Sequence, residues 1–481
     1  MPNHPRNYFE MFVKMGQRIE SDGSIQNKNE KLARLVLFIC TICYFYSLVL
    51  LLRNYAAVEW PFYGYSYGGI PFNEVIIAIV CIAVISLFVP LQINSPSSLF
   101  LIVVYIFLVL PAITAFLGLY RVDTGLYYEP LIVTSLSFSA ACYLVPHKKW
   151  KAGNAFVLHH LVIPVLVTLH SVTLLYLFYR FGSIMSFANL DNLYEQRALG
   201  AAENFIDRYA QTYSQYVFSL GLLSLGLVRK NTIIILYGLF GTLVNFSITA
   251  EKAGAIYPIF IVGLYFAMKS GRKILTATSF IVTTFTIVLL FSAILYRQSA
   301  VADFIAWYLG VRSILGPGAF LSYYYDFFNP DHLTYFSHIR GISVFVQPPP
   351  AYFNDFRWPS IGLILGEDYF GLRTLNANAS FVASDGIASL GTVGIPIAFA
   401  VFSLFITFVD KVTRGLNAAA SCCLFFPIAL TLTNGSIFTV LTSFGGIFWL
   451  IIVRYYVSGR ARTQKFPRRR APRLIKPDKL N

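Results

Sequence analysis

The chain has 481 residues, of which 57% are hydrophobic and only 12% are charged, and its formal net charge is +15. Ordinary soluble domains carry about 25% charged residues, so this composition excludes a soluble enzyme of the usual kind. It predicts an all-α polytopic membrane protein.

The N-terminal region (1–31) is polar, and the first apolar run that follows it, 32–52, is long enough to span a bilayer. That run has no small-residue cleavage site, so we expect it to stay in the mature protein as the first transmembrane helix. Apolar runs of similar kind predict about 12 transmembrane helices in all. The expected spans are 32–52, 75–91, 99–119, 131–145, 156–179, 213–228, 232–250, 256–268, 274–296, 386–409, 418–433 and 437–457.

The charges of the connecting segments predict the orientation of these helices. With residues 1–31 placed inside, most of the basic residues fall on the inner segments and most of the carboxylates fall outside. This distribution follows the positive-inside rule, so both termini, including the basic tail 458–481, are expected in the cytoplasm. The excess of positive charge is therefore a topology signal, and we expect no nucleic-acid partner.

The longest segment between predicted spans is 298–385, which separates the first nine helices (32–297) from the last three (386–457). Loops beyond about 15 residues are usually functional or disordered, and the aromatic content of this one argues against disorder. We expect it to form a folded helical or irregular cap loop on the outer face. Candidate chemistry within it comes from His338, from the pair Glu367 and Asp368, and from Arg312, Arg340, Arg373 and Tyr324.

A second outer segment, 180–212, alternates acidic and apolar residues at roughly helical spacing. This pattern predicts one or two short amphipathic helices at the membrane interface. A solvated surface with local ion pairs accounts for the charges. The alternative is that an arginine such as Arg197 contacts an anionic group, because the guanidinium fork suits phosphates and carboxylates.

The turn at Glu251 and Lys252 precedes an apolar run, 256–268, that is about 20 Å long as a helix, shorter than the hydrocarbon core of about 30 Å. Either that helix begins earlier or the turn dips below the outer surface. In both cases Lys252 lies near membrane depth, where an ionisable residue suggests function. Mutual neutralisation of Glu251 and Lys252 is the structural alternative.

Three features together resemble a known family. They are the basic turn after an apolar helix, the large outer loop, and a late helix that opens with Gly391-Thr392-Val393-Gly394. This arrangement is similar to the bacterial oligosaccharide repeat-unit polymerases, the O-antigen polymerases of the Wzy type, which are related to the O-antigen ligases. The ligases typically carry a histidine about eleven residues before the first glycine, where this chain has Ser380. That difference favours the polymerases.

The resemblance implies a metal-independent glycosyltransferase, without a cofactor, that joins undecaprenyl diphosphate-linked repeat units during O-antigen or capsular polysaccharide synthesis. Its partners would be the lipid-linked oligosaccharides, membrane lipids, a chain-length regulator and a flippase. The diphosphate leaving group needs cations, for which we single out Lys252, Arg312, Arg340, Arg373 and Arg197, with Tyr324 as an aromatic platform. Glu367, Asp368 and His338 are the candidate catalytic bases.

Purely structural roles remain open for these candidate bases. His338 can form hydrogen bonds within a packed loop, and the two carboxylates can cap a helix or pair with Arg373. Three other functions also remain open: an O-antigen ligase, a polyprenyl-phosphate-sugar glycosyltransferase and a lipid-oligosaccharide flippase. A transporter is expected to show internal repeats, and none is evident. The expected location is the bacterial inner membrane.

Overall fold

The computed structural model describes residues 6–119, 124–145, 161–187, 192–269, 276–330, 332–339, 342–346, 360–372 and 375–461. Within these ranges the chain is helical with no strand, as the composition predicts. Seven helical stretches there are long and apolar enough to cross a membrane. They are Asn29–Glu59, Pro96–Gly118, Val162–Ile184, Thr232–Thr249, Ala277–Leu295, Ala300–Phe328 and Val382–Thr413. The chain is thus of the multi-pass membrane type, with fewer full-length candidates than the twelve expected.

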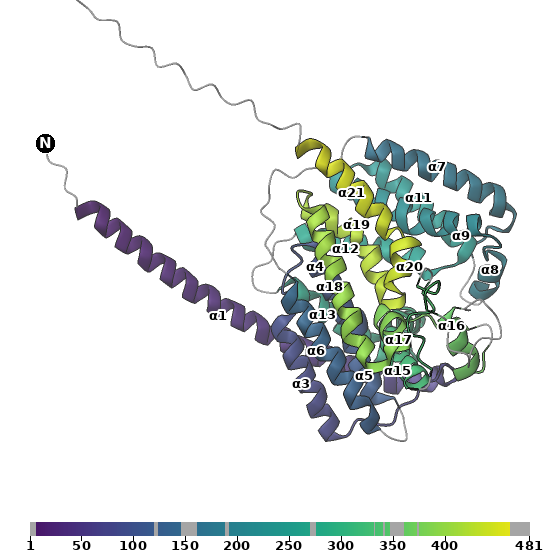
Figure 1. The fold of residues 1–481 in the computed structure, drawn as a ribbon, viewed down its shortest axis with the longest axis horizontal. Coiled ribbons are helices and arrows are strands. Elements are labelled where there is room, and N and C mark those ends of the chain that lie inside the picture. Colours follow the sequence, from purple (N-terminus) through teal and green to yellow (C-terminus); the bar gives the residue numbers. More distant parts are fainter. Residues whose placement is uncertain are drawn as a thin grey trace, which may run out of the picture.

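Four shorter apolar helices account for much of the difference from twelve. They are Phe72–Phe88, Ile256–Met268, Ala418–Asn434 and Gly446–Tyr455. The first helix, α1 (Arg6–Leu51), begins well before the predicted span, because the polar N-terminal region is helical as well. Figure 1 shows this helix projecting from one side of the bundle, with α8 and α16 on the opposite side.

The remaining helices have the following bounds. The first half contains α3 (Phe72–Phe88), α4 (Pro96–Val104), α5 (Leu110–Gly118), α6 (Tyr128–Leu144), α7 (Val162–Phe181), α8 (Leu193–Leu199), α9 (Phe205–Thr212), α10 (Leu220–Arg229) and α11 (Thr232–Thr249). The second half contains α12 (Lys252–Lys269), α13 (Ala277–Leu295), α14 (Ala300–Ile305), α15 (Gly316–Phe328), α16 (Ile361–Ile364), α17 (Ala388–Leu390), α18 (Gly394–Thr413), α19 (Ala418–Thr431), α20 (Ile437–Thr442) and α21 (Gly446–Ala461). Wider π-helical turns join several of them, notably η7 (Tyr213–Ser219), η8 (Ala306–Leu315), η10 (Leu365–Tyr369) and η11 (Val382–Ile387).

The central element of the bundle is the continuous helix formed by α4, the π turn η3 (Tyr105–Val109) and α5. Every residue from Pro96 to Gly118 is buried. The helix α4 packs on α18 and α19, and α5 packs on α15. Because all of its sides are buried by other parts of the protein, this helix lies at the core of the bundle.

The start of the central helix is held by side chains that satisfy its free amides. Ser95 and Ser98 form a reciprocal capping box. The carboxylate of Asp410 on α18 accepts hydrogen bonds from the Ser97 backbone N (2.9 Å) and the Ser97 Oγ (2.5 Å). Arg34 on α1 donates to the carbonyl of Val89, which lies shortly before Ser95 in the chain. We call this side of the bundle the Ser97 end; the sequence predicts it to be cytoplasmic.

Other contacts tie helix termini together at what we call the Trp60 end. Tyr55 donates to Asp303 Oδ1 at 2.8 Å, and Tyr127 donates to Asp326. The indole of Trp60 stacks on that of Trp307, with ring centroids 3.3 Å apart. These contacts join the segment after α1, which holds η1 (Leu52–Ala56) and Trp60, and the turn η4 (Thr124–Tyr127) before α6 to the stretch α14–η8–α15.

The stretch Ala300–Phe328 is the first part of the expected cap loop, 298–385. The structure shows it as a continuous helical run that is long and apolar enough to cross a membrane. Both of its ends contact the Trp60 end, because Asp303 contacts Tyr55 and Asp326 contacts Tyr127. Between these ends, η8 and α15 pack on η3 and α5, so the run packs into the bundle from that end. The aromatic residues that suggested a surface cap lie within a packed helix.

The expected Gly391–Gly394 step has a backbone explanation. Gly391 has φ of +60°, and a Cβ there would lie 2.1 Å from Asn329 Oδ1. A Cβ on Gly394 would lie 2.0 Å from the carbonyl oxygen of Gly386, so the start of α18 packs directly on η11. Both glycines are thus required by close packing at the Trp60 end.

Candidate functional site

The candidate site is a group of charged and phenolic side chains that we call the cation cluster: Arg197, Glu251, Arg312, Tyr216 and Tyr308. Its members come from α8, the turn between α11 and α12, η8 and η7. The side chain of Tyr308 is 6% exposed and lies within electrostatic range of Arg197, Arg312 and Glu251. Residues that are far apart in the sequence therefore converge at the Trp60 end.

One side of the cluster is built on the predicted amphipathic segment. That segment forms two short helices, α8 and α9, as expected. Gln196 fixes α8 on α11 by donating to the carbonyl of Ser247 at 2.8 Å. Arg197, the next residue, is half-buried and donates to the carbonyl of Ala250 at 3.3 Å. Its guanidinium is thereby held beside the Glu251 turn.

Glu251 is the carboxylate of the cluster. Tyr216 Oη donates to its Oε2 at 3.2 Å. Burial raises the pKa of the Glu251 carboxyl, while the nearby Arg197 and the Tyr216 hydroxyl act in the opposite direction. A carboxylate with a raised pKa is better matched to proton transfer near neutral pH than an ordinary glutamate.

Arg312 forms the other side of the cluster. Its guanidinium carbon lies 5.1 Å from the ring centroid of Trp307, which is a cation–π distance. Trp307 is itself braced by the stacked Trp60. Burial raises the pKa of the Tyr65 phenol, and Arg312 lies close enough to oppose that rise. Arg312 is thus supported on an aromatic base and remains half-buried.

The other predicted cations are only partly visible. The structure resolves the Lys252 question in favour of an earlier helix start, because α12 begins at Lys252. The side chain of Lys252 lies outside the described part of the chain, as do Arg340 and Arg373 entirely. Their placement relative to the cation cluster is therefore left to experiment.

The predicted bases lie on other segments than the members of the cation cluster. Glu367 and Asp368 are exposed on η10. His338 lies in an irregular segment, 332–339, that is fastened to the end of η11 and to α17 by hydrogen bonds from Thr334 N to Ala388 O (2.8 Å) and from Tyr335 N to Ser389 O (3.1 Å).

The environment of His338 favours the hydrogen-bonding role. Its Nδ1 lies 2.8 Å from Thr334 Oγ1, and its ring also interacts with the backbone of Ser384. Burial lowers the pKa of His338 to about 4. The imidazole is consequently neutral at physiological pH and a weak proton acceptor there.

This lowered pKa predicts a pH-dependent contribution to stability. The unfolded chain binds a proton at His338 near pH 6.5, whereas the folded chain does so only near pH 4. The free energy of unfolding should therefore fall as the pH drops below about 6.5, by at most about 3 kcal/mol near pH 4. Thermal unfolding in detergent at pH 7.5 and pH 5 should show a steeper loss for the wild type than for His338→Gln. Parallel losses would contradict the buried neutral state.

Tyr324 requires a correction to its expected role as a platform. Its side chain is 0% exposed, and its hydroxyl donates to the carbonyl of Ala377 at 3.1 Å. A ring packed in this way cannot face a glycan in this structure. The cause is the helical course of 316–328, which turns this residue toward the core.

Sequence reasoning missed a buried carboxylate, Asp385. It is 4% exposed on η11, and its Oδ2 accepts a hydrogen bond from Ile437 N at 2.7 Å. The only sequence signal is a single acid set in the otherwise uncharged run 374–409. Such a residue is normally partnered or functional at membrane depth.

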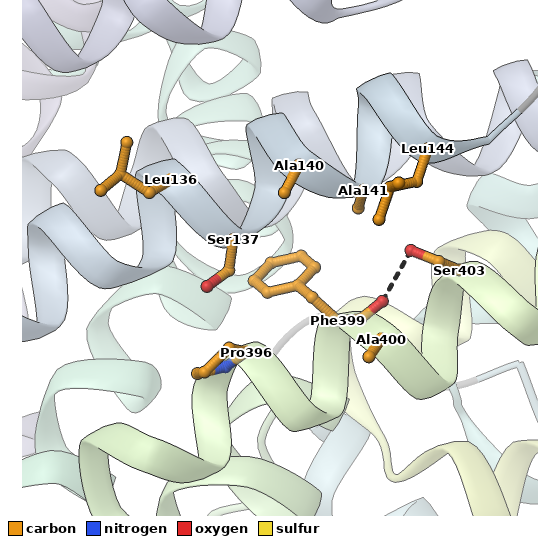
Figure 2. Close-up of a pocket in the computed structure, with 9 residues that line it drawn as sticks. All are labelled: Leu136, Ser137, Ala140, Ala141, Leu144, Pro396, Phe399, Ala400 and Ser403. Carbon is orange, nitrogen blue, oxygen red and sulfur yellow. Dashed lines mark hydrogen bonds between the residues drawn. The ribbon is translucent and has the colours of Figure 1, made fainter.

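A surface groove of about 290 Å³ lies elsewhere, between α6 and α18. Figure 2 shows its lining, in which the Phe399 ring lies between the two helices and the Ser403 hydroxyl is bonded to the Phe399 carbonyl. The lining is apolar and carries no titratable group. It consists of Leu136, Ser137, Ala140, Ala141, Leu144, Pro396, Phe399, Ala400 and Ser403. A groove of this kind suits an apolar chain, and its lining provides no side chain for acid–base catalysis.

Comparison with protein-family models, curated proteins and solved structures finds no match to this chain.

Proposed function

We propose that this protein is a membrane glycosyltransferase that polymerises undecaprenyl diphosphate-linked oligosaccharide repeat units. The observation that carries the proposal is that Arg197 and Arg312, from distant segments, both lie within electrostatic range of Tyr308, and that Arg197 also lies close to the Glu251 carboxylate. Two half-buried guanidinium groups and a carboxylate around one tyrosine suit a reaction in which a diphosphate leaves and a hydroxyl loses its proton.

The reaction assigns a role to each group. The acceptor sugar hydroxyl attacks the anomeric carbon of the donor, a new C–O bond forms, and the bond from that carbon to the diphosphate oxygen breaks. The electron pair leaves with the diphosphate, whose growing negative charge is balanced by Arg197 and Arg312. The hydroxyl proton passes to a carboxylate, for which Glu251 is the first candidate and Glu367 and Asp368 are the exposed alternatives.

The location follows from the same proposal. The Trp60 end would face the periplasm of a bacterial inner membrane, and both termini would be cytoplasmic. A chain-length regulator and a flippase would be the protein partners. The ligase and the polyprenyl-phosphate-sugar transferase use related chemistry and are the nearest alternative functions.

Deleting the gene in its host and separating the surface polysaccharide on a gel tests the proposal. Loss of a polymerase leaves the lipid core bearing a single repeat unit. Loss of a ligase leaves long chains that are not attached to the core, and loss of a flippase leaves neither product. Only the first pattern, restored by the plasmid-borne wild type, supports polymerisation.

A further inference from the structure

We infer that Asp385 forms a second polar subsite, separate from the cation cluster, which binds a hydroxyl group of the acceptor glycan. This inference rests on the proposed function and adds a binding residue that the sequence did not indicate. The Asp385 carboxylate accepts a hydrogen bond from Ile437 N at its Oδ2, and the Ser436 hydroxyl lies close to the same carboxylate. Its Oδ1 is buried and has no hydrogen-bond partner among the described residues.

An unpartnered carboxylate oxygen is costly in a buried position, so it calls for a ligand. An ionised carboxylate is an acceptor only, and the missing partner must therefore be a donor. A divalent cation would need several converging oxygen or nitrogen ligands, and the described residues contain no group of three or more His, Cys, Asp or Glu side chains that could hold one. A hydroxyl group meets the requirement with a single bond.

The surroundings of Asp385 are polar and match a sugar. Ser389 is fully buried, and its hydroxyl also has no hydrogen-bond partner among the residues described. The segment that carries Thr334 and His338 lies against the same stretch of η11 and α17. This segment covers Asp385 and is held in place by two backbone hydrogen bonds to Ala388 and Ser389, so a ligand would reach the carboxylate only by displacing it.

The position of Asp385 relative to the cation cluster fits two substrates. Tyr257, which interacts electrostatically with Glu251, has its hydroxyl 3.5 Å from Thr431 Oγ1. Asp385 contacts Ile437, only six residues further along. Six residues span at most about 20 Å, and less here because 432–434 form a 3₁₀ turn. Asp385 and the cation cluster thus lie on either side of the short segment 431–437, as the acceptor and donor sites of a transferase would.

The test uses full-length protein in nanodiscs. Lipid-linked repeat units from cells that lack the protein serve as substrate, and undecaprenyl diphosphate serves as the probe of the cation cluster. Asp385→Asn retains an acceptor for Ile437 N but loses the charged oxygen. We expect its KM for repeat units to rise about tenfold, with kcat and the Kd for undecaprenyl diphosphate within twofold of wild type. Asp326→Asn is the matched control, because both oxygens of Asp326 are already bonded to tyrosines.

A KM for Asp385→Asn within twofold of wild type would overturn the inference while leaving the proposed function intact. Wild-type protein that neither extends repeat units nor binds undecaprenyl diphosphate would overturn both. A second measurement needs no variant: repeat units should slow the labelling of Asp385 by dicyclohexylcarbodiimide, followed by peptide mass spectrometry, and undecaprenyl diphosphate alone should not. Equal labelling under both conditions would also count against the subsite.

Discussion

Replacing Arg312 with alanine is expected to lower the rate of polymerisation by about 10²- to 10³-fold, because a preorganised charge that stabilises the leaving group typically contributes that much. The guanidinium is fixed over the Trp307 ring, so a mobile surface cation cannot take its place. Rate measurements on reconstituted protein with lipid-linked repeat units, together with the Kd for undecaprenyl diphosphate, would quantify the loss.

The matched control for this experiment is Arg53→Ala. Arg53 lies at the Trp60 end and is exposed, so the variant removes the same charge from the same side of the molecule without touching the cluster. Its rate should remain within about twofold of wild type, since exposed charges interact weakly through water. Equal losses in the two variants would point to a general surface-charge effect and would remove Arg312 from the proposed site.

Replacing Asp410 with alanine is expected to lower the free energy of unfolding by about 3 kcal/mol, because two hydrogen bonds to a charged acceptor are lost at a buried helix start. The Ser97 backbone N and hydroxyl would lose their partner, and the central helix would lose the group that holds its first turn. Thermal or denaturant unfolding in detergent measures the change.

Lys411→Ala provides the comparison, because Lys411 is the exposed neighbour of Asp410 on α18. This substitution should lower the free energy of unfolding by less than about 0.5 kcal/mol. Ser97→Ala removes one of the two bonds. A double-mutant cycle between positions 97 and 410 should therefore give a coupling energy of about 1 kcal/mol or more. A cycle with no coupling would show that the carboxylate does not support the helix start.

Several elements were predictable because their signal is local. The apolar runs specify membrane helices, since each run alone is long enough to satisfy its backbone in lipid. The alternating charges of 180–212 specify short amphipathic helices, and α8 and α9 are found there. The Gly391–Gly394 step was noted only as part of a family resemblance, and the positive φ of Gly391 and the close packing of both glycines became evident in the structure.

The site was only partly predictable for a different reason. Arg197, Arg312 and the Glu251 turn were each singled out as isolated residues, yet nothing in their spacing indicates that they meet around Tyr308. The surroundings of Tyr324 and Asp385 could not be predicted from the sequence either. Whether a tyrosine faces the core, or a carboxylate lacks one partner, depends on which helices pack against it.

Hydropathy and helix propensity act over a few turns of one segment, so the amino-acid sequence was enough to indicate a multi-pass, all-helical membrane protein. The packing of Ala300–Phe328 on η3 and α5, and the charge that it brings close to Tyr308 together with Arg197, could be seen only in the folded structure. Electrostatic and hydrogen-bonding partners are set by distance in space. The packing of the apolar helices fixes those distances, and the sequence of a single segment does not indicate them.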